Sequence, residues 1–237
     1  MKKSTITQKF QQNWQKFAPQ FGTKQWEENP DFLYFIEAPL PKNLWPEMEQ
    51  LSENLQQIKK MSGIWFPPEN MHITLALPGR KGVHFQAHEV STLKKTIERI
   101  VREQSSFSVT LGHLNCFADV LFREVWDKEE KLFSLHKKFC EEIPFAQDPE
   151  YKMKNYLPHI SLFLGKGDPA FFEHPKFSRE LPPLEMKVEK IVFGQARDES
   201  GKYNRKILKE FSLTGKKYFG SITMTALPTI CCNAVGS

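Results

Sequence analysis

Two short stretches of this 237-residue chain decide how the rest is interpreted: Met-His-Ile-Thr-Leu-Ala-Leu at residues 71–77 and Leu-Pro-His-Ile-Ser-Leu-Phe-Leu at residues 157–164. Each contains a histidine, an apolar residue, a hydroxyl residue and another apolar residue, in that order. A chain of ordinary composition would contain roughly 0.1 such strings by chance. The β-branched and apolar content of both stretches predicts that each forms a strand.

The alternation of side chains along a strand gives these two strings a common geometry. Side chains two residues apart point to the same face, so His72 and Thr74 share one face, as do His159 and Ser161. The apolar residues between and after them line the opposite face. If the two strands meet, one site holds two imidazoles and two hydroxyl groups.

This set of groups indicates phosphoryl transfer. Two histidines can divide general base and general acid catalysis between them, because their ordinary pKa lies near neutrality. Hydroxyl groups can donate hydrogen bonds to the non-bridging oxygens of a phosphate. Neither string has a carboxylate or thiolate at metal-ligand spacing, so no metal or other cofactor is expected. The alternative is that both are ordinary buried strands whose histidines bond to the backbone.

The remaining sequence predicts a mixture of helices and strands without a regular βαβ rhythm, which favours the α+β class. Helices are expected at residues 1–24, 45–60, 88–104 and 129–142, where apolar residues recur with helical spacing. Strands are expected at residues 31–38, 71–77, 107–111, 120–126, 157–164, 186–193 and 205–213. We expect Pro78-Gly79 to stop the 71–77 strand. A weak repeat of strand, helix, proline turn and histidine strand occurs before residue 80 and again between residues 107 and 165.

Composition and segment boundaries suggest a globular protein of the cytoplasm. No stretch has the roughly 18 apolar residues of a membrane-spanning helix, and the first residues lack the apolar core of a secretory signal. The net charge of +5 permits a polyanionic ligand without requiring one.

We expect an N-terminal extension with an amphipathic helix (1–30), a main domain (31–215) and a flexible tail (216–237). The four cysteines are expected to be free thiols: Cys116, Cys140, Cys231 and Cys232.

The paired strings resemble the signature of the 2H phosphoesterase superfamily, in particular the LigT-like RNA 2′,3′-cyclic phosphodiesterases (2′-5′ RNA ligase family). The resemblance covers roughly residues 31–213. It implies a bilobal α+β fold in which two antiparallel sheets flank a central cleft with a pseudo-twofold repeat and helices outside. It also implies His72 and His159 as the catalytic pair, with Thr74 and Ser161 binding the phosphate.

The implied reaction is metal-independent opening of a terminal 2′,3′-cyclic phosphate on RNA or a nucleotide, with 2′-5′ joining of RNA ends as the reverse chemistry. We expect a protein that acts without a cofactor or a membrane, and nothing in the sequence indicates more than a monomer. Two alternatives stay open. One is a module that binds a nucleotide such as AMP without turnover, and the other is an enzyme acting on 2′-5′ oligoadenylate or RNA 3′ tails.

Four further residues are candidates for substrate contacts. Phe163 follows Ser161 by two residues and so falls on the catalytic face, where it would stack on a base. Tyr156 is a second stacking candidate. Arg80 and Lys166 follow the two strings and would meet a phosphate. The alternatives are a core position for the aromatic residues and a solvated loop for the charged ones.

Overall fold

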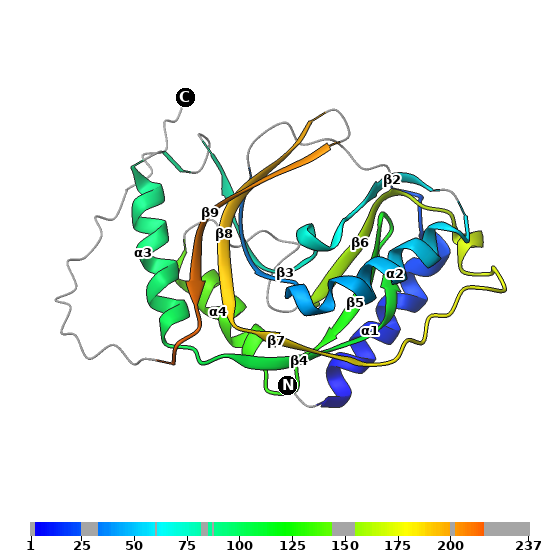
Figure 1. The fold of residues 1–237 in the computed structure, drawn as a ribbon, viewed down its shortest axis with the longest axis horizontal. Coiled ribbons are helices and arrows are strands. Elements are labelled where there is room, and N and C mark those ends of the chain that lie inside the picture. The colour runs from blue at the N-terminus through cyan, green and yellow to red at the C-terminus, as the bar shows by residue number, and fades with distance from the viewer. Residues whose placement is uncertain are drawn as a thin grey trace, which may run out of the picture.

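The structure is a computed structural model that describes residues 3–24, 33–59, 61–81, 85–86, 88–143, 155–199 and 202–215. Within these residues the chain forms four α-helices and nine strands (Figure 1). The helices are α1 (Lys3–Phe17), α2 (Trp45–Gln56), α3 (Glu89–Arg102) and α4 (Lys131–Glu142). The strands are β1 (Leu33–Pro39), β2 (Ser62–Trp65), β3 (His72–Arg80), β4 (Phe107–Cys116), β5 (Val120–Trp126), β6 (His159–Lys166), β7 (Leu184–Val188), β8 (Lys190–Glu199) and β9 (Lys202–Ser212).

The nine strands form one curled antiparallel sheet in the order β7-β4-β5-β6-β3-β1-β8-β9, with β2 also paired to β6. Strands β6 and β3 are joined at the centre by a single residue pair, Ile73 with Ile160. The sheet therefore has two parts. We call β7, β4, β5, β6 and β2 the β6 half, and β3, β1, β8 and β9 the β3 half.

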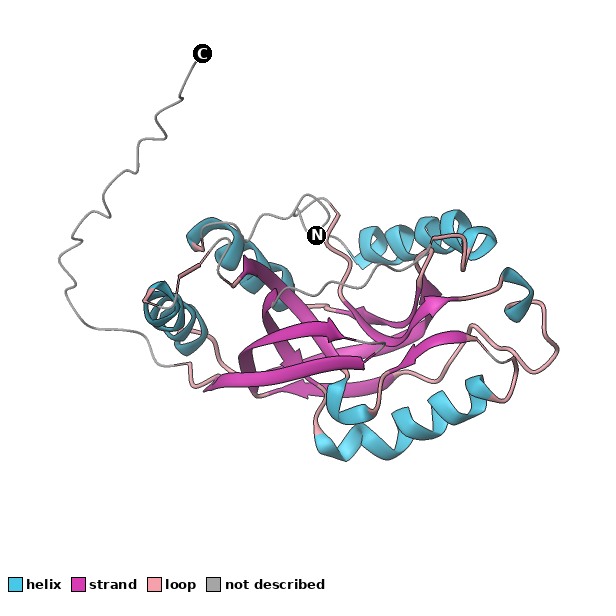
Figure 2. Cartoon of the chain, turned by 90° about the horizontal axis from the view of Figure 1, so that it is seen from above, coloured by secondary structure: helices cyan, strands magenta, loops and turns pink. Residues whose placement is uncertain are grey.

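The α+β class expected from the sequence is confirmed. The expected division into two separate sheets with a pseudo-twofold relation is not confirmed, because hydrogen bonding continues from β6 into β3. Figure 2 shows helices on both sides of the sheet. Helix α4 packs against β3, and α3 packs against α4 and β9.

Helices α1 and α2 cover opposite faces of the β6 half. Phe10 of α1 contacts Phe122 of β5, with ring centroids 6.5 Å apart. The next residue, Arg123, points the other way and donates from Nη1 to Met48 Sδ of α2 at 3.8 Å. Because neighbouring side chains alternate along a strand, these two contacts identify the face that each helix covers.

The N-terminal segment is anchored on the β6 half, and the helix expected there is confirmed. Asn13 Nδ2 donates to Asn115 Oδ1 at 2.9 Å and to Cys116 O at 2.7 Å. After the helix, Gly22 (φ +87°) packs so closely that a Cβ on it would lie 2.0 Å from Gly167 O, so this position requires glycine. The domain boundaries expected at residues 30 and 215 stay predictions.

The strand boundaries differ from expectation at several places, and β4, for example, runs on to Cys116 beyond the expected end at residue 111. Strand β3 continues through Pro78-Gly79 because the β1–β3 pairing is irregular between Tyr34 and Ile36, and a bulge tolerates a proline that lacks an N–H. Strand β2 was not expected, since it is short and mostly exposed. The single strand expected at 186–193 is two strands that meet at Glu189 and pair with different neighbours.

Two further expectations concern the location of the protein in the cell and the state of its cysteines. Across the described ranges no helix is long and apolar enough to span a membrane. The cytoplasmic location stays a prediction. Within the described part of the chain neither Cys116 nor Cys140 is in a disulfide bond, and burial raises the pKa of Cys116 to about 12. Cys231, Cys232 and the expected tail at 216–237 lie outside the described residues.

Candidate active site

The two histidine strings lie on adjacent strands at the centre of the sheet. Ile73 pairs with Ile160, and both are fully buried. Because paired residues share a face and their neighbours point the other way, His72, Thr74, His159 and Ser161 lie together on the opposite face. All four are half-buried. Diagonal neighbours on such a face lie about 7–8 Å apart, so the two imidazoles start from positions within reach of one phosphate group.

Both imidazoles are held by the same local hydrogen bond. His72 Nδ1 lies 2.7 Å from Asn70 O, and His159 Nδ1 lies 2.7 Å from Leu157 O. A carbonyl oxygen only accepts, so Nδ1 carries the proton in each ring. The Nε2 atom of each neutral ring then carries the lone pair. In both strings the residue two positions earlier sets the tautomer, which leaves Nε2 as the atom able to take or return a proton.

His72 lies beside a buried ion pair. Its Nε2 is 3.4 Å from Glu37 Oε2, and Glu37 Oε1 forms an ion pair with Arg205. The ring of Phe35 is nearly parallel to the His72 ring at a centroid distance of 6.5 Å. Burial lowers the pKa of His72 to about 4, and the nearby His159 adds to the lowering. The effect of His159 means that a positive charge on one imidazole disfavours a positive charge on the other.

His159 has aromatic neighbours instead. Its ring lies 4.7 Å from Phe122 and 5.3 Å from Phe117, between centroids. Burial lowers the pKa of His159, and the hydrogen bond to Leu157 opposes this effect. Both rings are therefore neutral near pH 7 in the free protein. An anion placed between them would favour protonation of one.

The two hydroxyl residues occupy matching positions beside the imidazoles. Thr74 pairs with Glu37 of β1, and Ser161 pairs with Phe122 of β5. Each hydroxyl is thus next to the side chain that contacts the histidine of its own half. The arrangement can present two hydroxyl donors and two Nε2 atoms to one ligand.

The structure places the two aromatic candidates in the core. Phe163 is fully buried and packs against Phe21 (6.3 Å) and Trp65 (5.1 Å). Tyr156 is 3% exposed, stacks on His136 at 3.9 Å and donates from its hydroxyl to Thr74 O at 3.0 Å. Neither ring is open to a base. The stacking roles expected for Phe163 and Tyr156 are therefore corrected to packing roles.

The charged candidates are dispersed. Lys166 is exposed at the end of β6, where it pairs with Ser62. The side chain of Arg80 lies outside the described residues, so its expected phosphate contact stays a prediction. Arg123 is buried and donates to Gly112 O at 3.0 Å and to Pro182 O at 2.5 Å, which indicates a structural role.

Sequence reasoning missed Glu37 and Arg205. Glu37 had a readable signal, because it is a carboxylate within the apolar run of β1 and is fully buried. Arg205 had none, because β9 carries several basic residues and nothing in the sequence distinguishes this one. Among the described side chains, no cluster of three or more histidine, cysteine or acidic residues could hold a metal ion. Independence from metals stays a prediction.

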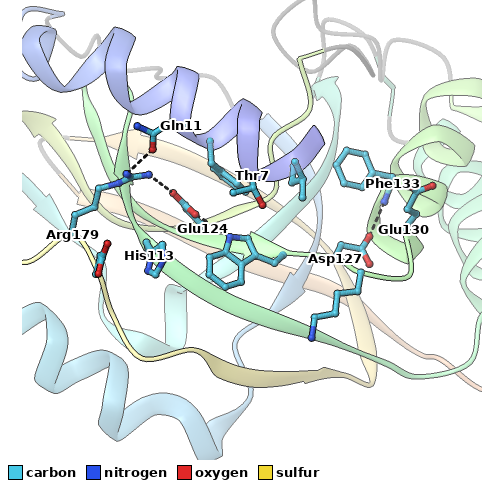
Figure 3. Close-up of a pocket in the computed structure, with 13 residues that line it drawn as sticks. Thr7, Gln11, His113, Glu124, Asp127, Glu130, Phe133 and Arg179 are labelled. Atoms are coloured by element: carbon cyan, nitrogen blue, oxygen red, sulfur yellow. Dashed lines mark hydrogen bonds and ion pairs between the residues drawn. The ribbon is translucent and has the colours of Figure 1, made fainter. Parts of the chain in front are cut away.

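A separate cavity of about 330 Å³ lies between α1, the β4–β5 hairpin and the segment around Arg179 (Figure 3). Glu124 in its wall accepts hydrogen bonds from Asn115 (2.8 Å), Arg179 (3.2 Å) and Trp126 (2.9 Å). Asn115 also donates to Phe10 O at 2.9 Å and Arg179 to Gln11 Oε1 at 2.9 Å, so the network fastens α1 to the hairpin. The cavity is lined by none of the four residues of the histidine strings: its lining is Ile6, Thr7, Phe10, Gln11, His113, Glu124, Trp126, Asp127, Lys128, Glu130, Phe133, Arg179 and Glu180.

Comparisons with known proteins agree with this arrangement. The family described as the 2′-5′ RNA ligase superfamily matches residues 40–199, more than half of the chain. Comparison with curated protein sequences gives no match. Among solved structures, TT0787 of Thermus thermophilus is similar with a TM-score of 0.60 and 19% identity, over 78% of this chain and 100% of that one.

Escherichia coli LigT in complex with 3′-AMP is similar with a TM-score of 0.56 and 18% identity, over 79% of this chain and 99% of that one. Its complex with NADP+ gives a TM-score of 0.57 and 19% identity, over 79% and 99% of the two chains. The family match identifies the chain as a member of the 2′-5′ RNA ligase superfamily, and at these identities the likeness to TT0787 and LigT shows that the fold is shared.

Proposed function

We propose that this protein is a phosphodiesterase that opens terminal 2′,3′-cyclic phosphates of RNA or nucleotides, with His72 and His159 as its catalytic pair. The observation that carries the proposal is the matched pair of imidazoles. Each is held through Nδ1 by a carbonyl two residues earlier, and both lie on one face of adjacent strands. Membership of the superfamily supports phosphodiesterase or ligase chemistry in general.

The proposed hydrolysis uses one histidine on each side of the phosphorus. The neutral Nε2 of one ring takes a proton from water as the water oxygen forms a bond to phosphorus. The other ring, protonated when the anionic substrate binds, donates its proton to the departing ribose oxygen as that P–O bond breaks. Thr74 and Ser161 donate hydrogen bonds to the non-bridging oxygens. The product is a ribose with one free hydroxyl and one phosphate monoester, for which the family resemblance favours the 2′-phosphate.

Ligation is the same reaction with a 5′-hydroxyl in place of water. The hydroxyl oxygen attacks the cyclic phosphorus, one histidine takes its proton, and the other protonates the leaving 3′ oxygen. A 2′-5′ linkage results. E. coli LigT, which shares the fold, has been solved with 3′-AMP, NADP+ and ATP. Those complexes support a substrate that carries a nucleoside and a phosphate.

The test is a turnover assay with 2′,3′-cyclic AMP and with an RNA oligonucleotide that ends in a 2′,3′-cyclic phosphate, both in the presence of EDTA. We expect a phosphate monoester product that is retained under EDTA and lost in His72→Ala and His159→Ala. Tight binding of the nucleotide without product would instead favour a binding module. Turnover of 2′-5′ oligoadenylate or of an RNA 3′ tail, with neither cyclic substrate consumed, would contradict the substrate class and leave the histidine pair in place.

A further inference from the structure

Beside His72 lies a cation that the mechanism above does not use. We propose that Arg205 is a third phosphate-binding residue, held in place by Glu37 and directed at the same substrate phosphate as Thr74 and Ser161. This inference rests on the proposed function, because it assigns the anion-binding part of that same site. The Arg205 side chain belongs to β9, near the C-terminal end of the described residues.

The first observation is that the Arg205 guanidinium is buried with hydrogen-bonding capacity to spare. Its side chain is 8% exposed, and that of its ion-pair partner Glu37 is 0% exposed. Nη1 makes a long hydrogen bond to Glu69 O at 3.4 Å, and within the described part of the chain Nε has no acceptor. Burying a charged donor without an acceptor costs stability. An anionic ligand at this position would supply the missing acceptor.

The second observation is where the guanidinium lies. Glu37 contacts Arg205 with one carboxylate oxygen and approaches His72 Nε2 to 3.4 Å with the other. The guanidinium and the imidazole are therefore on two sides of one carboxylate. The Arg205 side chain also lies over the Phe35 ring, with the guanidinium carbon 4.9 Å from the centroid, and Phe35 in turn faces His72. These contacts hold the cation on the catalytic face.

The third observation is a matched arginine that lacks these properties. Arg179 also pairs with a buried glutamate, Glu124, at 3.2 Å. Its other nitrogens are occupied, since Nε donates to Leu114 O at 3.3 Å and Nη1 to Gln11 Oε1 at 2.9 Å. All three Arg179 nitrogens have an acceptor, and the residue fastens α1 to the sheet. Within the described residues Arg205 Nε has none, and its ion-pair partner Glu37 lies beside His72.

A guanidinium suits this task chemically. Its planar fork presents several N–H donors and forms short, charge-assisted hydrogen bonds with phosphate oxygens. With both imidazoles neutral in the free protein, Arg205 provides a permanent positive charge near the phosphate. Glu37 balances that charge before the substrate arrives. The carboxylate also holds the fork, so less side-chain freedom is lost when the anion binds.

The experiment measures inorganic phosphate binding by titration calorimetry, together with kcat and KM for 2′,3′-cyclic AMP, in Arg205→Lys and in the matched control Arg179→Lys. We expect Arg205→Lys to weaken phosphate binding and raise KM at least about tenfold, the scale of one lost charge-assisted hydrogen bond. The control should stay within about twofold. The neutral pair Glu37→Gln with Arg205→Gln should show the same loss, and it avoids leaving one buried charge unpaired.

Unchanged phosphate affinity in a folded Arg205→Lys protein, or no measurable phosphate binding by the unmodified protein, would overturn the assignment. Circular dichroism and thermal unfolding establish that the variants are folded. The two proposals separate cleanly. An unmodified protein that binds phosphate through Arg205 but turns over neither cyclic substrate retains this inference and refutes the proposed function. If the unmodified protein turns over the cyclic substrate and Arg205→Lys keeps full activity, the proposed function is retained and the role of Arg205 is refuted.

Discussion

The two halves of the sheet carry the same histidine string in different surroundings. In the β3 half, the strand next to the string supplies Glu37, which pairs with Thr74 and lies 3.4 Å from the His72 ring. In the β6 half, the equivalent neighbour is Phe122, which pairs with Ser161 and contacts the His159 ring. The imidazoles are thus duplicated, while the groups beside them are a carboxylate in one half and a phenyl ring in the other.

The covering of the two halves differs as well. Helix α1 and the residues after it lie on the histidine-bearing face of the β6 half, where Phe10 contacts Phe122 and Phe21 buries Phe163. In the β3 half a small apolar cluster of Phe35, Leu77, Val192 and Ala196 forms apart from the main core, and Arg205 lies on it. Strand pairing therefore brings the two histidine strings together, while α1 and Arg205 give the two halves different surroundings. A substrate that binds both histidines meets charge in one half and apolar surface in the other.

The largest expected effect comes from removing either imidazole. We expect His72→Ala and His159→Ala each to lower kcat at least about a hundredfold, the usual scale for a general acid or base. Rate measurements with 2′,3′-cyclic AMP across pH check this, and the bell-shaped profile should lose a limb in each variant. Since the half with Glu37 and the half with Phe122 differ, the two variants should lose different limbs.

The matched control is His88→Ala, which removes an exposed histidine just before α3. It should leave kcat unchanged. Near-full activity in His72→Ala or His159→Ala would rule out the paired mechanism. If both variants lost the same limb, the halves would be equivalent in catalysis despite their different neighbours.

The second-largest expected effect is a loss of stability in acid. Burial lowers the pKa of His72 to about 4, whereas an unfolded histidine titrates near 6.5. As pH falls, the unfolded state therefore binds the proton before the folded state does. The stability that depends on a neutral His72 is fully present above pH 6.5 and is lost as pH falls toward 4. At about 1.4 kcal/mol per pKa unit, the loss is on the order of 3 kcal/mol. Urea unfolding at pH 7 and pH 4.5 measures it.

The comparison with His72→Asn isolates this histidine from other groups that titrate in the same range. The charged and titratable groups around the ring are Glu37 and His159, with Arg205 on the other side of Glu37, and burial lowers the pKa of His159 too. The variant should lose markedly less stability between the two pH values than the unmodified protein does. An equal loss in both proteins would contradict the buried, neutral state assigned to His72.

The shared face of the two histidine strings was predictable from the sequence, because it depends on local rules. Alternation put His72 with Thr74 and His159 with Ser161, and the apolar residues between them required burial on the other face. One strand pairing then brought the strings together. The long helices and strands were predictable for the same reason, since each shows several periods of its own pattern.

The rest depends on contacts between distant segments. Phe163 does fall on the face expected from alternation, but Phe21 from the N-terminal segment covers it, and no local pattern shows that. Arg205 reaches Glu37 only because β9 pairs with β8 and β8 with β1. Strand β2 is four residues long, too short for a periodic signal. Sequence reasoning missed the residues whose positions depend on pairing between distant strands.

A smaller effect is expected from the hydroxyl groups. Thr74→Val and Ser161→Ala should each lower kcat/KM about tenfold, because each removes one hydrogen bond to a charged phosphate oxygen. Thr74→Ser and Ser161→Thr should retain most activity. Thr110→Val on β4 is the matched control, since it removes a half-buried hydroxyl away from the site. Equal activity in Thr74→Val and the control would remove Thr74 from the phosphate site.

The smallest expected effect tests whether α1 acts only as a cover on the β6 half. Asn13→Ala removes the hydrogen bonds to Asn115 Oδ1 and Cys116 O that join α1 to β4. We expect a loss of about 1–2 kcal/mol in the free energy of unfolding, with kcat unchanged, because these bonds hold the helix and do not touch the histidines. Gln20→Ala removes only an exposed bond to Lys16 O and should cost less than about 0.5 kcal/mol. A drop in kcat for Asn13→Ala at full stability would mean that α1 shapes the His159 side of the site, so that the asymmetry between the halves would extend to catalysis.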